Sequence, residues 1–296
     1  MATQPSAPTS NPVELRGDYS QAAADYSVDQ QWDRYTAEDH AIWQTLYARQ
    51  MQVIEKYAAP EFIAGTRALH ATADRIPHID ETNRILEQST GWTIVCVPGL
   101  IPETQFFGHL AHRRFPVTVW IRRRDELDYL VEPDIFHDFF GHVPLLTDPL
   151  FARFMQAYGE AGPKAIAAGG LKMLSRLYWY MVEFGLIRTP AGLRAYGSGI
   201  LSSKGETVYS IDSTMPRRIA FDLHRVMRTD YLIDNFQQTY FVIDSFEQLF
   251  HAGYDTDFDP IYRLYQDEPA IAPDAVLPGD KLLPGNPVLA PASPSP

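Results

Sequence analysis

Apolar residues recur at helical spacing over a long segment near the start of the chain. Spacings of three and four residues place side chains on one face of an α-helix, which then packs against a core. Thr36 and Asp39 resemble a capping box with Asp in the usual place of Glu, so we predict that a helix begins there. Its apolar face comprises Ile42, Trp43, Leu46, Tyr47, Val53, Ile54 and Tyr57.

Shorter helices and a few strands follow along the chain. The runs of β-branched residues at 93–97 and 117–121 favour short strands, and the segments near 193–197 and 206–210 favour a small hairpin. Helical patterns dominate, so the predicted fold class is mainly α with a few short β-strands. The further helices are expected at 60–70, 80–90, 103–112, 133–142, 149–167, 171–187, 216–227 and 244–252.

The two ends of the chain differ in composition from its middle. Residues 1–30 are rich in Ala, Ser, Gln and Pro, which indicates a mobile leader. Repeated Pro residues at 269–296 are incompatible with a continuing helix and indicate a Pro-rich tail. No linker-like composition interrupts residues 31–268, so we predict a single folded domain there, long enough to bury a sizeable core.

The composition limits the partners and the compartment. With 25 Lys and Arg against 37 Asp and Glu, the formal net charge is −12, which disfavours binding to nucleic acid or to an anionic membrane surface. No apolar run approaches the roughly 18 residues that a membrane span needs. Cys96 is the single cysteine, which excludes an intrachain disulfide and a cysteine-rich zinc site. Because the N-terminus also lacks the basic and apolar regions of a signal peptide, we expect a soluble, cytoplasmic protein.

Two histidines and one carboxylate are candidate metal ligands. His137 and His142 are five residues apart among aromatic and apolar neighbours, and Glu183 lies in a later segment that is poor in other charges. Two His with one carboxylate form the facial triad of non-haem Fe(II) sites. On a straight helix, however, residues i and i+5 point about 140° apart. The histidines share a metal only if the helix is distorted or ends near His142; the alternative is two packed histidines beside a buried glutamate.

Three blocks of the sequence carry a resemblance to a known family. They are EPDIFHDFFGHVP at 132–144, YWYMVEFGL at 178–186 and AYGSGILSSKGE at 195–206. In this order and spacing they resemble the pterin-dependent aromatic amino acid hydroxylases, and among these the short bacterial phenylalanine 4-hydroxylases. The resemblance covers roughly residues 35–260, and it implies a single catalytic domain of this family's type.

The resemblance implies a set of iron and substrate contacts. His137, His142 and Glu183 correspond to the iron ligands. Arg122 corresponds to the arginine that holds the substrate's α-carboxylate, and a guanidinium fork matches a carboxylate where Lys would not. Trp179 and Phe184 are expected to form the walls of the aromatic pocket. The complete set of expected substrate contacts is Arg122, Tyr129, Trp179, Phe184, Gly199 and Ser202.

The family pattern also implies a pterin site. Phe106 is expected to stack on the pterin ring, and backbone groups near Gly99 and Ile101 to bond its polar edge. Asp138, which follows the first expected iron ligand, is expected to reach the pterin through water.

The chain departs from the family pattern at a few positions. Leu130 and Val131 stand where animal members often have Thr and Pro. Pro116 replaces a His that is often found near the pterin, and Asp138 is one methylene shorter than the Glu of the animal enzymes. These changes alter pocket contacts and leave the expected iron triad intact.

The implied activity is hydroxylation of L-phenylalanine to L-tyrosine in phenylalanine catabolism, with Fe(II), a tetrahydropterin and O₂. A preference for tryptophan or tyrosine is the alternative. Trp179 stands where tryptophan hydroxylases tend to carry Phe, and it would crowd a second indole, so phenylalanine is favoured over tryptophan. A zinc hydrolase and a non-catalytic, metal-stapled interaction domain are more distant alternatives. Since the chain has no room for an N-terminal regulatory domain and no C-terminal tetramerisation helix, we expect a monomer.

Overall fold

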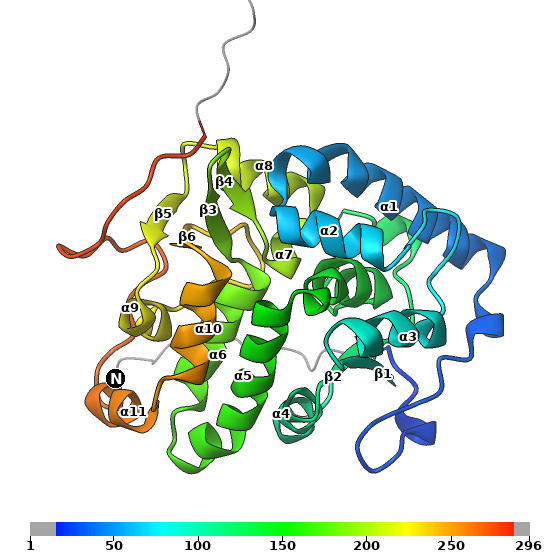
Figure 1. The fold of residues 1–296 in the computed structure, drawn as a ribbon, viewed down its shortest axis with the longest axis horizontal. Coiled ribbons are helices and arrows are strands. Elements are labelled where there is room, and N and C mark those ends of the chain that lie inside the picture. Colours follow the sequence, from blue (N-terminus) through cyan, green and yellow to red (C-terminus); the bar gives the residue numbers. More distant parts are fainter. Residues whose placement is uncertain (1–15, 129, 287–296) are drawn as a thin grey trace, which may run out of the picture.

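Helices make up most of the fold, and the strands form two small sheets (Figure 1). The structure is a computed structural model that describes residues 16–128 and 130–286. It confirms the predicted fold class, mainly α with a few short strands. The α-helices are α1 Ala37–Tyr57, α2 Pro60–Ala68, α3 Ile79–Ser89, α4 Glu103–Ala111, α5 Pro149–Ala167, α6 Leu171–Tyr178, α7 Ser198–Leu201, α8 Lys204–Asp212, α9 Leu223–Arg228, α10 Phe246–Tyr254 and α11 Asp259–Tyr265.

The first helix, α1, begins where the capping box predicts. The Thr36 hydroxyl accepts a hydrogen bond from the Asp39 N–H at 3.2 Å, and the Thr36 N–H donates to the Asp39 carboxylate at 2.8 Å. These two bonds satisfy backbone donors that a helix N-terminus otherwise leaves free. The apolar face then buries Trp43 and Ile54 completely, so α1 forms one side of the core.

Within the described residues, six strands lie in two sheets. β1 (Thr93–Val97) and β2 (Arg114–Thr118) form a parallel pair, with α4 as the connection. The second sheet has the order β4-β3-β6-β5, in which β3 is antiparallel to β4 and parallel to β6. Strand β4 begins directly after the turn from β3 at Gly192, whose φ of +101° is a conformation that favours glycine. The second-sheet strands are β3 Leu186–Thr189, β4 Gly192–Ala195, β5 Arg217–Ala220 and β6 Thr239–Ile243.

Several predicted elements are wrong in type or extent. The segment 206–210 belongs to helix α8, so β4 pairs with β3 and makes no hairpin with 206–210. The predicted helix at 216–227 divides into β5 and α9, and the predicted helix at 171–187 ends before β3. Strand β6 went unpredicted because all five of its residues are buried. A fully buried strand shows no alternation of apolar and polar residues.

Two short π-helical segments position the site. They are Phe136–His142 and Trp179–Glu183, and both contact the short helix α7. A π-helical turn contains an extra residue and makes i→i+5 hydrogen bonds, and such turns occur often at functional sites. The segments meet inside a core in which α5 packs against α4, α6 and α10.

The described parts of both end segments are hydrogen-bonded to the folded body. The Val28 N–H donates to the Cys96 carbonyl at 2.9 Å, and the Ile271 N–H donates to the Arg228 carbonyl at 2.8 Å. The division into a leader at 1–30, a catalytic domain at 31–268 and a tail at 269–296 stays a prediction. Within residues 16–128 and 130–286, every helix is too short or too polar to span a bilayer.

A buried carboxylate, Glu206, lies where α8 meets β6. Its Oε1 accepts hydrogen bonds from the Gln237 N–H at 3.1 Å and from the Tyr240 hydroxyl at 2.7 Å. Burial raises the pKa of Glu206 to about 7, because these neutral donors only partly replace the lost hydration. The carboxyl therefore takes up a proton in the folded state at a higher pH than in the unfolded chain.

Replacing Glu206 with Gln should remove a pH-dependent loss of stability. The folded state binds the extra proton between the unfolded pKa of 4.5 and the folded value of about 7. The wild-type free energy of unfolding, relative to that of Glu206→Gln, should therefore fall as the pH rises through this window, by up to about 3 kcal/mol. Urea denaturation of both proteins at pH 5 and pH 8.5 measures this difference. A difference that stays the same at the two pH values contradicts the prediction.

Candidate metal centre and the cavity around it

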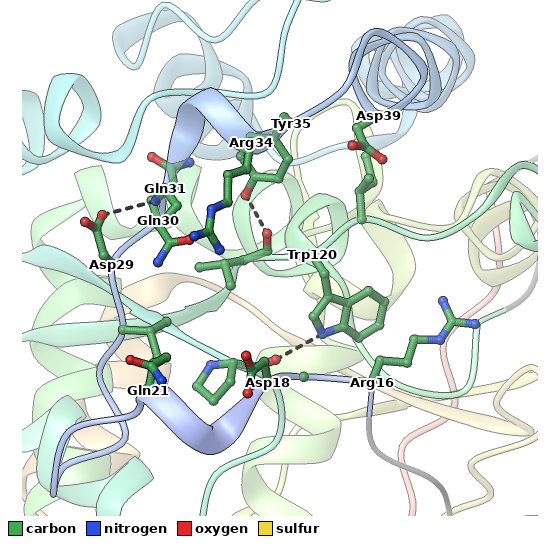
Figure 2. Close-up of a pocket in the computed structure, with 15 residues that line it drawn as sticks. Arg16, Asp18, Gln21, Asp29, Gln30, Gln31, Arg34, Tyr35, Asp39 and Trp120 are labelled. Carbon is green, nitrogen blue, oxygen red and sulfur yellow. Dashed lines mark hydrogen bonds between the residues drawn. The ribbon is translucent and has the colours of Figure 1, made fainter.

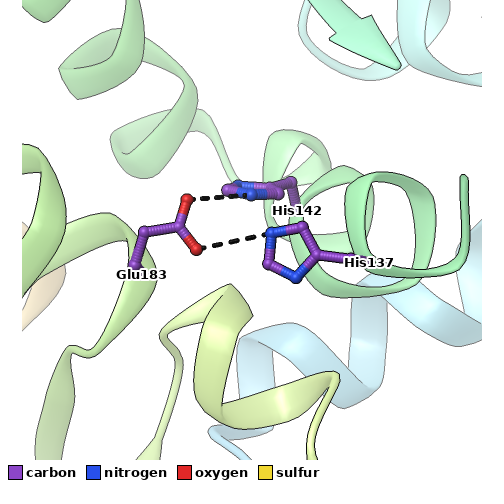
Figure 3. Close-up of side chains that lie close together, drawn as sticks. All are labelled: His137, His142 and Glu183. Atoms are coloured by element: carbon purple, nitrogen blue, oxygen red, sulfur yellow. Dashed lines mark ion pairs between the residues drawn. The ribbon is translucent and has the colours of Figure 1, made fainter. Parts of the chain in front are cut away.

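Three side chains from the two π-helical segments converge (Figure 3). His137 Nε2 lies 3.5 Å from Glu183 Oε2, and His142 Nε2 lies 3.2 Å from Glu183 Oε1. The possible ligand atoms of all three lie within 4.8 Å of one another. Among the described residues, this is the one group of three His, Cys, Asp or Glu side chains with such a spacing.

The π-helical turn explains how the two histidines face the same point. In an α-helix they would diverge, whereas i→i+5 hydrogen bonding places residues five apart on successive turns of one face. The segment also ends at His142, where a 3₁₀ turn containing Pro144 follows. The predicted distortion or ending of the helix near His142 is confirmed, and the two imidazole rings lie 5.2 Å apart.

Protonation at the triad suits a divalent metal. Burial lowers the pKa of His137 to about 4, although the nearby Glu183 raises it. Burial alone would raise the pKa of Glu183, but the two histidines and the Ser198 hydroxyl outweigh burial and lower that pKa to about 2. At neutral pH the site thus offers a neutral imidazole and an ionised carboxylate, the forms in which His and Glu bind metals.

Hydroxyl groups hold two of the three side chains in place. The Ser198 hydroxyl donates to Glu183 Oε2 at 2.7 Å, and the Ser202 hydroxyl is hydrogen-bonded to His137 Nδ1 at 2.8 Å. Both serines belong to the third sequence block, on α7 and directly after it. His142 instead packs its ring 4.7 Å from the ring of Phe115. The nitrogen and oxygen donors are therefore fixed toward one point, which fits the two-His, one-carboxylate set of non-haem iron.

A cavity of about 300 Å³ opens beside the triad. It brings the three expected iron ligands together with the four expected pterin contacts and with one expected substrate contact, Trp179. Arg122, Phe184, Gly199 and Ser202 lie outside its lining, and Tyr129 lies outside the described residues. The lining residues that sequence reasoning did not assign include Phe115, Thr118, Pro133, Tyr158, Tyr178 and Tyr231.

The expected pterin contacts all line this cavity. The Phe106 ring packs edge-on against Tyr178, with ring centroids 5.5 Å apart. A Cβ on Gly99 would come within 2.5 Å of Glu132 Oε1, so the backbone there passes too close for a larger residue. Asp138 accepts a hydrogen bond from the Thr118 N–H at 2.8 Å, and burial raises its pKa to about 7.

Aromatic rings also surround Trp179. The Trp179 indole stacks on Tyr231 with centroids 4.1 Å apart and packs against Phe184 at 4.9 Å. A Cβ on Gly199 would lie 2.8 Å from the Phe184 ring, so the glycine lets that ring approach. Gly199 contacts Phe184 and Ser202 contacts His137, and neither residue lines the cavity itself. The sequence did not predict Tyr231 as a residue of the cavity, because its loop contains no motif that links it to the triad.

Arg122 forms a buried ion pair with Asp134. Two of the five guanidinium N–H groups donate to the two carboxylate oxygens, each at 2.8 Å. The same carboxylate accepts from the backbone N–H groups of Arg122 at 2.9 Å and His137 at 3.0 Å. Burial alone would raise the pKa of Asp134, but Arg122 and these N–H groups hold it below its usual range. Asp134 thereby connects the arginine to the segment that carries the histidines.

A second cavity, of about 390 Å³, lies away from the triad (Figure 2). The N-terminal segment and residues 119–121 form its walls, with Arg16 and Arg34 alongside Asp18, Asp29 and Asp39. None of the site residues expected from the sequence line it. Its mixed charges select no ligand class, so the site chemistry is assigned to the cavity beside the triad.

Replacing Asp134 with Asn should destabilise the protein by about 3–5 kcal/mol, because a buried guanidinium would lose its counter-charge. Asp128→Asn is the matched control, since Asp128 pairs with Arg49 at an exposed position and such pairs contribute about 0–1 kcal/mol. Chemical denaturation at pH 7 measures both. Equal losses in the free energy of unfolding would show that the buried ion pair stabilises the protein no more than the exposed one.

Comparisons with known proteins identify the family. The family model described as biopterin-dependent aromatic amino acid hydroxylase matches residues 4–254. The phenylalanine-4-hydroxylase of Ralstonia nicotianae is 56% identical over 259 residues, which cover 88% of this chain and 82% of that protein. The corresponding protein of Chromobacterium violaceum is 55% identical over 264 residues, which cover 89% of each.

Solved structures of the Chromobacterium violaceum enzyme share the fold. One with bound iron and phenylalanine has a TM-score of 0.85 at 53% identity, covering 89% of this chain and 96% of that chain. Another with bound iron(III) and oxidised 7,8-dihydrobiopterin has a TM-score of 0.85 at 55% identity, covering 88% and 94%. The chain belongs to the family of biopterin-dependent aromatic amino acid hydroxylases.

Proposed function

We propose that this protein is a phenylalanine 4-monooxygenase, which converts L-phenylalanine to L-tyrosine with O₂ and a tetrahydropterin at Fe(II). His137, His142 and Glu183 hold the iron. Relatives named phenylalanine-4-hydroxylase are more than half identical over most of the chain. The observation that carries the proposal is the convergence of two imidazole nitrogens and one carboxylate at one end of an aromatic-walled cavity.

Bound Fe(II) supplies open coordination positions for O₂, and the reduced pterin supplies electrons. The chain's own residues contribute orientation and protection. Ser202 and Ser198 fix the His137 ring and the Glu183 carboxylate, so the ligand atoms keep their positions as substrates bind. The rings of Phe106, Phe107 and Phe115 in the lining offer water no hydrogen bond.

The substrate side is set by Arg122 and Trp179. Asp134 uses two of the five N–H groups of Arg122, and the remaining donors bind the α-carboxylate of the amino acid. The phenyl ring packs against Trp179, which lines the cavity, and Phe184 packs against the indole outside the lining. Gly199 and Ser202 support the substrate side through Phe184 and His137, and Tyr129 is the remaining proposed substrate contact.

The pterin side is set by the wall that contains Phe106. Its ring stacks on the pterin, while backbone groups around Gly99 and Ile101 bond the polar edge. Asp138 faces the same cavity, and its raised pKa of about 7 lets it hold or release a proton near neutral pH. Asp138 thus offers the pterin a hydrogen-bonding group that works through water.

Two finer points also belong to this proposal. The protein acts as a monomer, and it acts in the cytoplasm. The composition and the single cysteine support the compartment.

Replacing His142 with Ala should abolish both iron retention and tyrosine formation, because it removes one of three protein ligands. His112→Ala is the control, since His112 is exposed and its ring is hydrogen-bonded to the Gly108 carbonyl of its own helix. Iron content after anaerobic loading and desalting, together with chromatographic assay of tyrosine, gives the readout. Normal turnover in His142→Ala would refute the ligand assignment.

A further inference from the structure

The amide side chain of Gln237 connects the wall of the cavity to a neighbouring loop. Its Oε1 accepts a hydrogen bond from the Trp179 indole N–H at 3.1 Å. Its Nε2 donates to the Leu232 carbonyl at 2.8 Å and to the Asn235 carbonyl at 3.4 Å. Gln237 is only 2% exposed, so few waters can replace these bonds.

The loop that Gln237 holds carries the stacking partner of Trp179. Tyr231 lies at the start of this loop, and its ring lies 4.1 Å from the indole at an interplanar angle of 13°. Beyond Tyr231, Ile233 is 70% exposed, and Phe236 is 44% exposed and packs on Tyr209 with ring centroids 5.1 Å apart. The Trp179 indole therefore contacts both the loop, through Tyr231, and the Gln237 amide. The Gln237 amide makes the hydrogen bonds that join the indole to the loop.

The backbone of Gln237 is itself anchored. Its N–H donates to the buried carboxylate of Glu206 at 3.1 Å, and strand β6 begins two residues later. At the other end of the loop, the Asp230 carbonyl accepts a bond from the Tyr180 hydroxyl at 2.6 Å. The Gln237 amide therefore extends from an anchored backbone and can determine the position of the Trp179 indole.

We propose that Gln237 is a positioning residue that fixes the Trp179 indole and thereby sets which aromatic ring the cavity accepts. This inference rests on the proposed phenylalanine hydroxylation. With the indole held, the cavity matches a phenyl ring and crowds a second indole. Without the amide, the indole loses its acceptor and the loop loses its donor, so the wall can shift and admit a larger ring.

Gln237→Leu tests this role, with Gln238→Leu as the matched control. Gln238 is adjacent and exposed, and its contact with a neighbouring strand runs through its backbone carbonyl. The ratio of kcat/KM for L-phenylalanine to that for L-tryptophan should fall about fivefold to tenfold in Gln237→Leu, the size expected for one lost neutral hydrogen bond. The rise in the KM for phenylalanine should exceed any change in kcat, while iron content and the KM for the tetrahydropterin stay as in the control.

Further variants separate positioning from general support of the fold. Gln237→Glu keeps the acceptor for the indole but has no N–H for the loop carbonyls, so its ratio should fall by less than that of Gln237→Leu. This variant decides the question if Gln237→Leu does not fold. In a Trp179→Phe background, which lacks the indole N–H, Gln237→Leu should have a smaller effect on the ratio than it has in the wild type.

Three results would overturn the inference. They are an unchanged ratio in Gln237→Leu and Gln237→Glu, an equal fall in kcat/KM for both amino acids, and full additivity with Trp179→Phe. If the wild-type protein forms no tyrosine from phenylalanine, the proposed function fails instead. If the wild-type protein is active and the Gln237 variants keep its selectivity, only the positioning role of Gln237 is refuted, and the proposed function stands.

Discussion

A negative charge buried between two imidazoles is the constraint on which the rest of the site depends. The Glu183 carboxylate is mostly buried and lies 3.2–3.5 Å from the nearest nitrogens of His142 and His137. Burial opposes its ionisation, yet its pKa is lowered to about 2. A buried negative charge needs a compensating partner, and the three side chains together offer the ligand atoms for a divalent cation.

The surrounding structure maintains this arrangement through local distortions and buried polar bonds. Two π-helical turns bring the ligands onto facing positions, and the serines of the α7 region hold the His137 ring and the Glu183 carboxylate. Asp134 extends the network to Arg122, so the proposed carboxylate-binding group and the histidine segment share one buried anchor. Under the proposed function, this shared anchor would couple the positions of the iron ligands and of the substrate through the backbone around His137.

Sequence patterns predicted the class of the fold and the family, and the structure and the comparisons confirm both. They also indicated that the helix must deform at His142, because five-residue spacing is incompatible with a shared ligand on a regular helix. The type of deformation depends on packing against α7, which no local pattern contains. Strand β6 was missed because burial on both faces removes the periodic signal. The division of 216–227 was missed because β5 forms by pairing with β6, which no local pattern contains. The role of Tyr231 beside Trp179 depends on a loop that returns from a distant part of the sequence.

The central claim is that His137, His142 and Glu183 together bind one iron. Crystals grown anaerobically with Fe(II) allow an anomalous difference map at the iron absorption edge to test this directly. We predict one strong peak within bonding distance of the Nε2 atoms of both histidines and of the Glu183 carboxylate. A peak at another group of residues, or an iron bound without one of these three side chains, would contradict the account.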